Sequence, residues 1–318
     1  MKCLCCGKEI ISGASAEEKI SSWHTGCIRK FFHSERMPEI SLDKEAIEEY
    51  ARKEVSAGTA VTGVQKKISL GFSKEGKDRL TMIDHPAGYI LKPQTPEYSF
   101  LPESEYLSMR MATIAGIQTV PFALIREDND LAYITARIDR CEEGNTCKYA
   151  MEDFCQLAGK LTFDKYKGSC ELCAKIINKF SIQTGLDLSE LFIRVVFSFI
   201  IGNSDMHLKN FSLIEAEPAG RSFKLSPAYD ILPVNVILPD DKDETALALN
   251  GKKRKLRRKD FVTFAESCGL NERAAVKIID RLCSYKYKYI EECKGSYLPE
   301  DMIANITELI EKRIEVIG

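Results

Sequence analysis

The spacing of apolar residues divides the chain into a strand-rich first part and a helix-rich second part. Apolar and polar positions alternate in several short stretches before residue 140, and this alternation is typical of strands. These stretches are residues 68–72, 79–83, 88–92, 120–126 and 131–137, and the last two flank an Asp-Asn-Asp turn that predicts a hairpin. Two helices are expected in the same part, at residues 43–55 and 103–115, and the second is amphipathic.

After Arg140 the apolar positions recur every three or four residues, which predicts helices. The helices are expected at residues 151–161, 169–184, 188–201, 261–268, 272–285 and 301–316, with two short strands at 211–215 and 223–226. Strands followed by helices are typical of a two-lobed α+β enzyme with a cleft between its lobes. We therefore expect three segments, which are residues 1–38, 39–140 and 141–318.

The composition is that of a globular protein with balanced charge. Of the 318 residues, 44% are hydrophobic, which suffices for a core and excludes a disordered or low-complexity chain. The 45 Lys and Arg residues face 47 Asp and Glu residues, and this balance argues against a protein that mainly coats nucleic acid. The longest apolar stretch, residues 191–202, is too short to span a membrane, and the first residues lack a signal-peptide pattern. We therefore expect a cytoplasmic protein.

The amino-terminal segment contains two close pairs of metal-ligand residues. Cys3 and Cys6 form the first pair, and His24 and Cys27 form the second. Two such pairs on two turns predict a tetrahedral zinc site, and four protein ligands leave no open position, so its role would be structural. Cys5 is an alternative to Cys6, although the spacing from Cys3 favours Cys6, and free thiols in a frayed terminus are the other interpretation.

A second pair of cysteines, Cys170 and Cys173, lies inside the predicted helix at 169–184. No second ligand pair lies nearby in the sequence, so we interpret these two cysteines as small buried residues of the helix.

Residues 203–210, Asn-Ser-Asp-Met-His-Leu-Lys-Asn, are the most informative stretch. Protein kinases place a catalytic Asp and a Mg²⁺-binding Asn with the spacing that separates Asp205 from Asn210. On such a loop, Asp205 would accept a hydroxyl proton, Asn210 would hold the metal, and Lys209 would steady the transferred phosphoryl group. The alternative is that Asn203 and Asp205 only cap a turn.

Asp230 follows Asn210 in the sequence, after a predicted strand pair. A second oxygen ligand at this place is what Mg²⁺ held against ATP requires. Asp230 would then play the part of the kinase D-F-G aspartate.

Lys92 ends a predicted apolar strand, which suits contact with the α- and β-phosphates of ATP. Glu105 on the following helix is its expected carboxylate partner, and Glu103 is the competitor. A plain surface lysine is the alternative. Residues 63–67, Gly-Val-Gln-Lys-Lys, would cover the phosphates or form an ordinary turn.

Residues 252–259 carry seven cations in eight positions. Such a run binds nucleic acid or an acidic partner in some proteins, and in others it is a solvated helix entry. The acidic run at 240–244 would compensate it locally.

Together these motifs resemble the HipA family of serine/threonine kinase toxins from bacterial toxin–antitoxin systems. The resemblance covers most of the chain from about Thr59 and is carried by residues 62–67, 89–93, 102–105, 134–140, 203–212 and 225–230. It implies a kinase-like fold, use of ATP with Mg²⁺, and phosphorylation of a protein serine or threonine. Family targets include aminoacyl-tRNA synthetases, and the usual partner is a HipB-like helix-turn-helix antitoxin that also represses the operon.

The resemblance also implies roles for individual residues. Asp205 resembles the catalytic base, Asn210 and Asp230 the Mg²⁺ ligands, and Lys92 the phosphate-contacting lysine. The other expected cofactor-binding residues are Glu105, Gly63, Val64, Gln65, Lys66, Arg137, Ile138, Asp139, His207 and Tyr229. Of these, Arg137 and Ile138 fall at the lobe hinge, and Asp139 and His207 fall where the family contacts the nucleoside.

Three departures from the family pattern matter. The Gly63 loop lies close to the start of the chain, which resembles the short, split branch in which a separate small protein supplies the missing amino-terminal subdomain. The serines that autophosphorylate in the family read Ala60 and Thr62 here, so Thr62 is the remaining candidate. The hinge has Ala136 where an acidic residue is common.

Two other functions compete with a protein kinase toxin. A small-molecule or lipid kinase on the same scaffold would use the same site residues. A non-catalytic regulator would use the zinc segment and the basic run to bind nucleic acid, but such a protein has no need of Asp205, Asn210 and Asp230 together.

Overall fold

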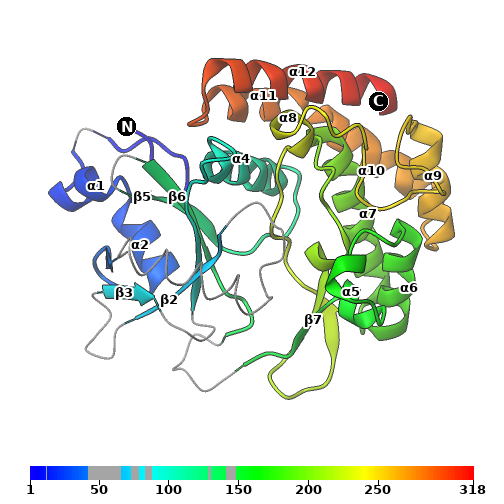
Figure 1. Ribbon diagram of the computed structural model, residues 1–318, viewed down its shortest axis with the longest axis horizontal. Helices are drawn as coiled ribbons and strands as arrows, with labels where there is room; N and C mark the ends of the chain where they lie inside the picture. Colours follow the sequence, from blue (N-terminus) through cyan, green and yellow to red (C-terminus); the bar gives the residue numbers. More distant parts are fainter. Residues whose placement is uncertain (12, 42–65, 73–78, 83–87, 128–129, 141–147) are drawn as a thin grey trace. The chain divides into compact units, whose positions relative to one another are not determined.

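The computed structural model describes residues 1–11, 13–41, 66–72, 79–82, 88–127, 130–140 and 148–318 (Figure 1). The predicted helix at 43–55, the loop residues Gly63, Val64 and Gln65, and Thr62 lie outside the described residues. The chain forms two compact units. The first comprises Met1–Tyr106 and Val120–Ile138, and the second comprises Leu107–Thr119 and Asp139–Gly318.

The first unit is built on a six-stranded sheet with the order β1-β3-β2-β4-β6-β5. Its strands are β1 (Glu39–Ser41), β2 (Ile68–Phe72), β3 (Arg79–Met82), β4 (Tyr89–Lys92), β5 (Phe122–Glu127) and β6 (Asp130–Ala136). The β1–β3 pair is parallel and the other pairs are antiparallel. The five predicted strands are confirmed, with small differences at their ends, whereas β1 was not predicted.

The amino-terminal segment is part of the core of this unit. It contains the helices α1 (Ala16–Ser21) and α2 (Thr25–Phe32). The Trp23 side chain is fully buried, and its Nε1 donates a hydrogen bond to the carbonyl of Leu124 on β5, at 3.1 Å. The rings of Phe31 and Phe32 pack against Trp23 and against Tyr89 on β4. Burial of these large aromatic surfaces therefore attaches the segment to the sheet.

Helix α4 (Leu101–Ile114) begins in the first unit and continues into the second. Its first turns carry buried polar residues, Glu103, Ser104 and Glu105. A buried carboxylate requires hydrogen-bond or ion-pair partners. The two carboxylates at this end of α4 therefore have a role other than keeping the protein soluble.

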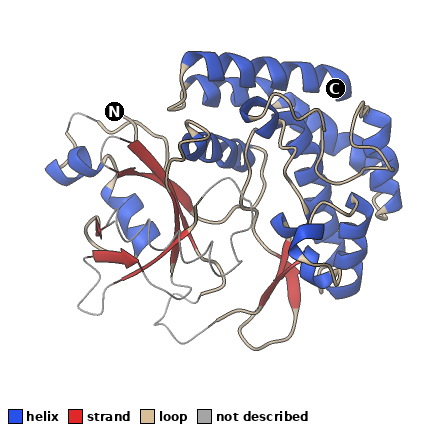
Figure 2. Ribbon diagram, in the orientation of Figure 1, coloured by secondary structure: helices blue, strands red, loops and turns tan. Residues whose placement is uncertain are grey.

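The second unit combines a three-stranded antiparallel sheet with a set of helices (Figure 2). The strands, in the order β7-β8-β9, are β7 (Met151–Asp153), β8 (Ser212–Glu215) and β9 (Phe223–Leu225). The helices are α5 (Phe154–Leu157), α6 (Cys170–Phe180), α7 (Thr184–Ile201), α8 (Val234–Ile237), α9 (Arg258–Ser267), α10 (Glu272–Ser284), α11 (Lys286–Lys294) and α12 (Glu300–Ile317), with short 3₁₀ turns η1 (Thr162–Asp164) and η2 (Leu208–Asn210).

The central helix of this unit is α7, which contacts α6, α10 and α12 (Figure 1). It is apolar nearly all round over its last turns, and a helix of that kind is stable only when it is surrounded. The mixed α+β architecture agrees with the prediction from the sequence. Helix α11 was not predicted.

The helix predicted at residues 151–161 was wrong. Met151–Asp153 instead form β7 and pair with β8, and only the short segment of α5 is helical. The capping box explains the late start, because Asp153 Oδ1 accepts from the Gln156 amide and Gln156 Oε1 accepts from the Asp153 amide. Gly159, with φ +66°, follows soon after α5 and ends it.

Two smaller predictions are confirmed. Cys170 and Cys173 are both buried in α6, as expected for small core residues. The acidic run at 240–244 compensates part of the basic run, since Arg254 pairs with Asp243 at 2.6 Å, while Lys252 pairs with Asp260, outside the acidic run, at 2.7 Å.

Among the described residues, no helix combines the length and the apolar character that crossing a membrane requires.

Asp187 is a buried polar group that joins α7 to its surroundings, and we expect its loss to destabilise the second unit. Its carboxylate accepts hydrogen bonds from Ser181 Oγ at 2.6 Å, from Gln183 Nε2 at 2.8 Å and from the Leu225 amide at 2.7 Å. Asp187→Ala leaves these donors unsatisfied, so the free energy of unfolding should fall by about 3 kcal/mol in urea denaturation. The control Ser189→Ala removes a hydroxyl that bonds within the same helix and should change it by less than about 0.5 kcal/mol. Equal stability of Asp187→Ala and the unmodified chain would contradict this assignment.

Candidate active site

The loop at residues 203–210 follows the buried carboxyl end of α7, and its path is fixed by the contacts at that end. Gly202 ends the helix with φ +74°, and a Cβ at this position would clash with the Leu309 side chain. The Asn203 amide then donates to the carbonyl of Ser198 at 2.8 Å, and Asn203 Oδ1 accepts from the Asp205 amide at 3.2 Å. The loop is therefore hydrogen-bonded at its start, as the turn interpretation of Asn203 expected.

Asp205 reaches solvent from this loop, because 43% of its side chain is exposed. The Tyr166 hydroxyl donates a hydrogen bond of 2.5 Å to Oδ1, and His207 Nε2 lies 4.0 Å from Oδ2. The Tyr166 ring meets the His207 ring edge to face at 5.0 Å between centroids. One carboxylate oxygen is thus held by Tyr166, while the other lies beside His207.

Tyr166 was not found by sequence reasoning. It lies 39 residues before Asp205, in no recognised motif, and only the packing of the second unit brings the two together. Burial together with the Asp205 carboxylate raises the pKa of Tyr166 above its usual value, so the hydroxyl keeps its proton and remains a donor.

Asn210 connects the Asp205 loop with the segment that contains Asp230. Its buried Nδ2 donates to the carbonyl of Asp205 at 3.1 Å and to the carbonyl of Asp230 at 3.4 Å. With the amide nitrogen engaged in this way, Oδ1 is the atom of Asn210 that can bind a cation. The structure therefore brings together Asp205, Asn210 and Asp230, which the sequence places on two separate segments.

Asp230 has a left-handed backbone with φ +61°, which non-glycine residues adopt rarely. Such conformations persist where surrounding contacts hold them, and they cluster at functional sites. One of these contacts comes from the preceding residue. The Tyr229 hydroxyl bonds Ser212 Oγ at 2.5 Å and donates to the carbonyl of Lys209 at 3.1 Å.

Lys209 has a partner on β7. Its Nζ lies 2.7 Å from Oδ2 of Asp153, and about a third of its side chain is exposed. This pair ties η2 to the start of α5. A role for Lys209 at a phosphoryl group stays a prediction.

The residues expected at the hinge lie on the border between the two units. Ile138 is the last residue of the first unit and Asp139 resumes the second. The Arg137 amide donates to the carbonyl of Gly88 at 2.8 Å, whereas Asp139 Oδ2 lies 2.6 Å from Nη1 of Arg140.

In the first unit, Lys92 forms a buried ion pair with Glu105. Lys92 Nζ lies 2.7 Å and 2.8 Å from the two carboxylate oxygens, and both side chains are at most 5% exposed. The alternative partner, Glu103, instead accepts hydrogen bonds from Gln94 at 2.8 Å and 3.0 Å, and burial raises the pKa of Glu103. The predicted pairing is confirmed and the surface-lysine alternative is wrong. Lys66, just before β2, is exposed.

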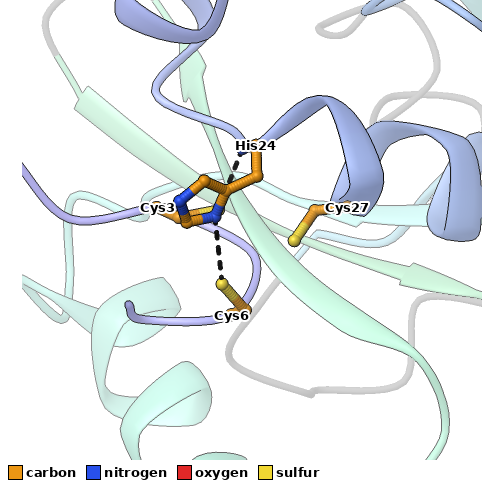
Figure 3. Close-up of side chains that lie close together, drawn as sticks. All are labelled: Cys3, Cys6, His24 and Cys27. Carbon is orange, nitrogen blue, oxygen red and sulfur yellow. Dashed lines mark hydrogen bonds between the residues drawn. The ribbon is translucent and has the colours of Figure 1, made fainter. Parts of the chain in front are cut away.

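The four predicted zinc ligands also lie together in the first unit (Figure 3). Their ligand atoms all lie within 4.8 Å of one another. His24 Nδ1 is 3.4 Å from Cys6 Sγ, and the His24 amide donates to Cys3 Sγ at 3.3 Å. Tetrahedral zinc with bonds of about 2.0–2.3 Å separates its ligand atoms by roughly 3.5–3.8 Å, so the set fits such an ion.

His207 is the group of this site whose charge state we expect to affect stability. Burial lowers its pKa, the Asp205 carboxylate opposes this effect in part, and its Nδ1 has no hydrogen-bond partner among the described residues. An unfolded histidine with a pKa of about 6.5 binds a proton more readily, so the stabilisation is complete above that pH and is lost as the pH falls below it.

The melting temperature should therefore fall between pH 7 and pH 5 more steeply in the unmodified chain than in His207→Gln. His33→Asn, which replaces an exposed histidine, should keep the steep fall. Identical pH profiles for His207→Gln and the unmodified chain would show that His207 is not held neutral.

Comparison with known proteins places these observations in a family. The chain is 27% identical to a Haemophilus influenzae protein named "Putative kinase", over 98% of this chain and 94% of that protein. It is 30% identical to "Putative kinase Y4dM" of Sinorhizobium fredii, over 79% of this chain and 63% of that protein. The chain thus spans less than two thirds of the second relative.

Solved structures share the fold, among them the two that follow. The HipA toxin of Shewanella oneidensis, solved with HipB and its operator DNA, matches with a TM-score of 0.68 and 19% identity, over 84% of this chain and 70% of that chain. The Helicobacter pylori proinflammatory kinase CtkA matches with a TM-score of 0.55 and 15% identity, over 79% of this chain and 93% of that chain. The kinase-like α+β fold expected from the motifs is confirmed.

The HipA-like C-terminal domain family matches residues 59–287, which is more than half of the chain. Both sets of candidate catalytic residues, around Lys92 and around Asp205, lie inside this range. Membership implies phosphoryl transfer with ATP and Mg²⁺. The chain therefore belongs to the HipA-like kinase family.

Proposed function

We propose that this protein is an ATP-dependent serine/threonine protein kinase that acts as the toxin of a bacterial toxin–antitoxin system. The observation that carries the proposal is the pair of hydrogen bonds from Asn210 to the backbone of Asp205 and of Asp230. They tie the backbone of the proposed base, Asp205, to the backbone of Asp230, which supports a site in which this base and two oxygen ligands act together in phosphoryl transfer to a hydroxyl.

Asp205 takes the part of the base. The target hydroxyl oxygen forms a bond to the γ-phosphorus of ATP, the bond from that phosphorus to the bridging oxygen breaks, and ADP leaves. The hydroxyl proton passes to Asp205, or is oriented by it. The hydrogen bond from Tyr166 to Oδ1 directs the other oxygen, Oδ2, towards the target.

Asn210 and Asp230 fit a magnesium site. Carboxylate and amide oxygens are hard ligands of the kind that Mg²⁺ binds. When bound, Mg²⁺ neutralises negative charge on the phosphates of ATP. Tyr229 acts as a positioning residue, because its hydroxyl ties the segment before Asp230 to Ser212 and Lys209.

Lys92 contacts the α- and β-phosphates of ATP in this proposal. Glu105 holds the ammonium group at the end of β4, and burial of both groups makes the pair directional rather than a loose surface contact. In the same proposal, the nucleoside contacts Arg137, Ile138, Asp139 and His207. The loop at Gly63–Lys66 covers the phosphates. Lys209 stabilises the transferred phosphoryl group.

The partners follow from the family. The Shewanella HipA was solved with HipB and operator DNA, which supports a HipB-like helix-turn-helix antitoxin for this chain as well. A separate small protein that resembles the HipA amino-terminal subdomain is a second partner. The target is a translation-related protein such as an aminoacyl-tRNA synthetase, and Thr62 is the site of autophosphorylation.

Replacement of Asp205 by Asn should lower the rate of phosphoryl transfer by a factor of at least about 10³. The substitution removes the proton acceptor and keeps the shape of the side chain. The measurement is phosphoproteomics of a bacterial lysate after addition of the purified chain with ATP and Mg²⁺. One dominant phosphosite on a translation-related protein is expected with the unmodified chain and none with the variant.

The matched control is Glu152→Gln, which neutralises an exposed carboxylate on β7 and should leave the phosphosite in place. Full activity of Asp205→Asn would refute the assignment of the base. If phosphate appears on a small molecule or lipid and on no protein, the chain is a kinase of that substrate class instead of a protein kinase.

Replacement of Tyr166 by Phe tests the hydrogen bond to Asp205. Loss of a hydrogen bond to a charged group is worth about 1.5 kcal/mol, so the rate of transfer at saturating ATP should fall roughly tenfold. The affinity for ATP should not change. Tyr287→Phe, at an exposed position on α11, is the matched control and should have no effect. A faster variant would mean that Tyr166 blocks Asp205 instead of orienting it.

A further inference from the structure

The Cys/His cluster of the amino-terminal segment lies outside the proposed catalytic machinery. We propose that Cys3, Cys6, His24 and Cys27 bind one structural zinc ion, and that this ion braces the first turns of α4, the helix that carries Glu105. The zinc site is argued from the positions of its four ligand residues alone. The bracing effect on ATP binding rests on the function proposed above for the Lys92–Glu105 pair.

The ligand set favours zinc over other common ions. Three thiolate sulfurs and one imidazole nitrogen form a Cys₃His set, which is typical of structural zinc. In Figure 3, the side chains of Cys6, His24 and Cys27 point into one small space beside Cys3. Oxygen-preferring ions such as Mg²⁺ and Ca²⁺ have no suitable ligand in this set.

The backbone around the ligands is built as two turns. The Cys3 amide donates to the carbonyl of Lys8, and the Gly7 amide donates back to the carbonyl of Cys3, both at 2.8 Å. Gly7 has φ +70°, a conformation that suits glycine at such a turn. His24 and Cys27 stand at the start of α2, which fixes the second pair.

The other imidazole nitrogen has a partner as well. His24 Nε2 lies 3.2 Å from the carbonyl of Glu9. A metal-bound histidine usually donates its second N–H to an oxygen, which sets the ring orientation and the tautomer. This contact leaves Nδ1, the nitrogen beside Cys6, for the metal.

The metal turn contacts α4 directly. The Tyr106 hydroxyl donates to the carbonyl of Cys5 at 3.2 Å, and the Tyr106 ring meets Phe122 on β5 edge to face at 5.6 Å. The neighbouring carbonyl of Leu4 accepts from the Leu124 amide on β5 at 2.9 Å. The turn between ligands Cys3 and Cys6 is thus fastened both to the sheet and to α4.

Tyr106 follows Glu105 directly in α4. A rigid turn at residues 3–6 therefore holds the helix where both carboxylate oxygens of Glu105 accept hydrogen bonds from the Lys92 ammonium. Without the metal, the side chains of this turn are no longer joined to the start of α2, and the turn keeps only its hydrogen bonds and the burial of Leu4. Loss of zinc should loosen the first turns of α4.

The first experiment measures the metal in the purified full-length chain. We expect one zinc ion per chain by elemental mass spectrometry, and tetrahedral Co²⁺ absorption with a thiolate charge-transfer band after exchange. Cys27→Ser and Cys6→Ser should lose the metal, while Cys283→Ser, at a half-buried cysteine of α10, should keep it.

Three outcomes would overturn the site. The first is a metal-free chain that unfolds at the same temperature with and without added zinc. The second is an octahedral Co²⁺ spectrum. The third is loss of metal in Cys5→Ser but not in Cys6→Ser. The last would replace Cys6 by Cys5 as ligand.

The second experiment tests the brace by hydrogen exchange on the full chain. Removal of zinc with a chelator should speed amide exchange in the first turns of α4, while α12 exchanges as before. Tyr106→Phe should keep the zinc and still show faster exchange in α4. Unchanged exchange in α4 after removal of the metal would refute the brace.

The affinity for a non-hydrolysable ATP analogue separates this inference from the proposed function. Removal of zinc should weaken binding at least tenfold, and this should also hold in the Asp205→Asn chain. If the zinc-loaded chain binds no ATP analogue, the kinase proposal fails while the metal site stands. If binding is unchanged without zinc, the link from the metal to Glu105 fails while the kinase proposal stands.

Discussion

The side-chain amide of Asn210 is the contact on which the candidate active site depends. It is buried, and it donates to the carbonyls of Asp205 and Asp230, which lie on separate segments of the sequence. An amide can satisfy two carbonyls and still offer an oxygen to a cation, which neither an aspartate nor a leucine could do. The same residue thus closes the loop and, in the function proposed above, supplies a metal ligand, and the left-handed Asp230 is tolerated because the contacts around it hold the backbone there.

In each unit a buried polar contact connects the core to residues of the proposed chemistry. The ion pair of Lys92 and Glu105 in the first unit is costly to desolvate, and its bidentate geometry offsets that cost. In the second unit, Asp187 and Gly202 fix the two ends of α7, so the loop after it starts at a defined place. The amino-terminal segment has an analogous role in our inference, because its metal turn contacts the residue next to Glu105.

Much of the fold followed from local patterns. The five predicted sheet strands and most helices of the second unit lie where apolar periodicity placed them, since that periodicity reflects which face of an element is buried. The prediction failed at residues 151–161, where a short strand precedes a one-turn helix. A stretch this short has no reliable period, and its pairing with β8, which lies far along the chain, is invisible in the local sequence.

The sequence by itself determined the family and the order of the motifs, and it favoured the pairing of Lys92 with Glu105 and the four Cys/His residues near the amino terminus, with Glu103 and Cys5 left as alternatives. These features depend on residue type and on spacing within short segments, which the chain carries before it folds. Only the tertiary structure decided that Tyr166 bonds Asp205, that Lys209 pairs with Asp153 and that Tyr106 contacts the carbonyl of Cys5. Each of these contacts joins residues 39 to 101 positions apart, and a hydrogen bond at that separation has no signal in the sequence because packing of the whole unit brings its two ends together.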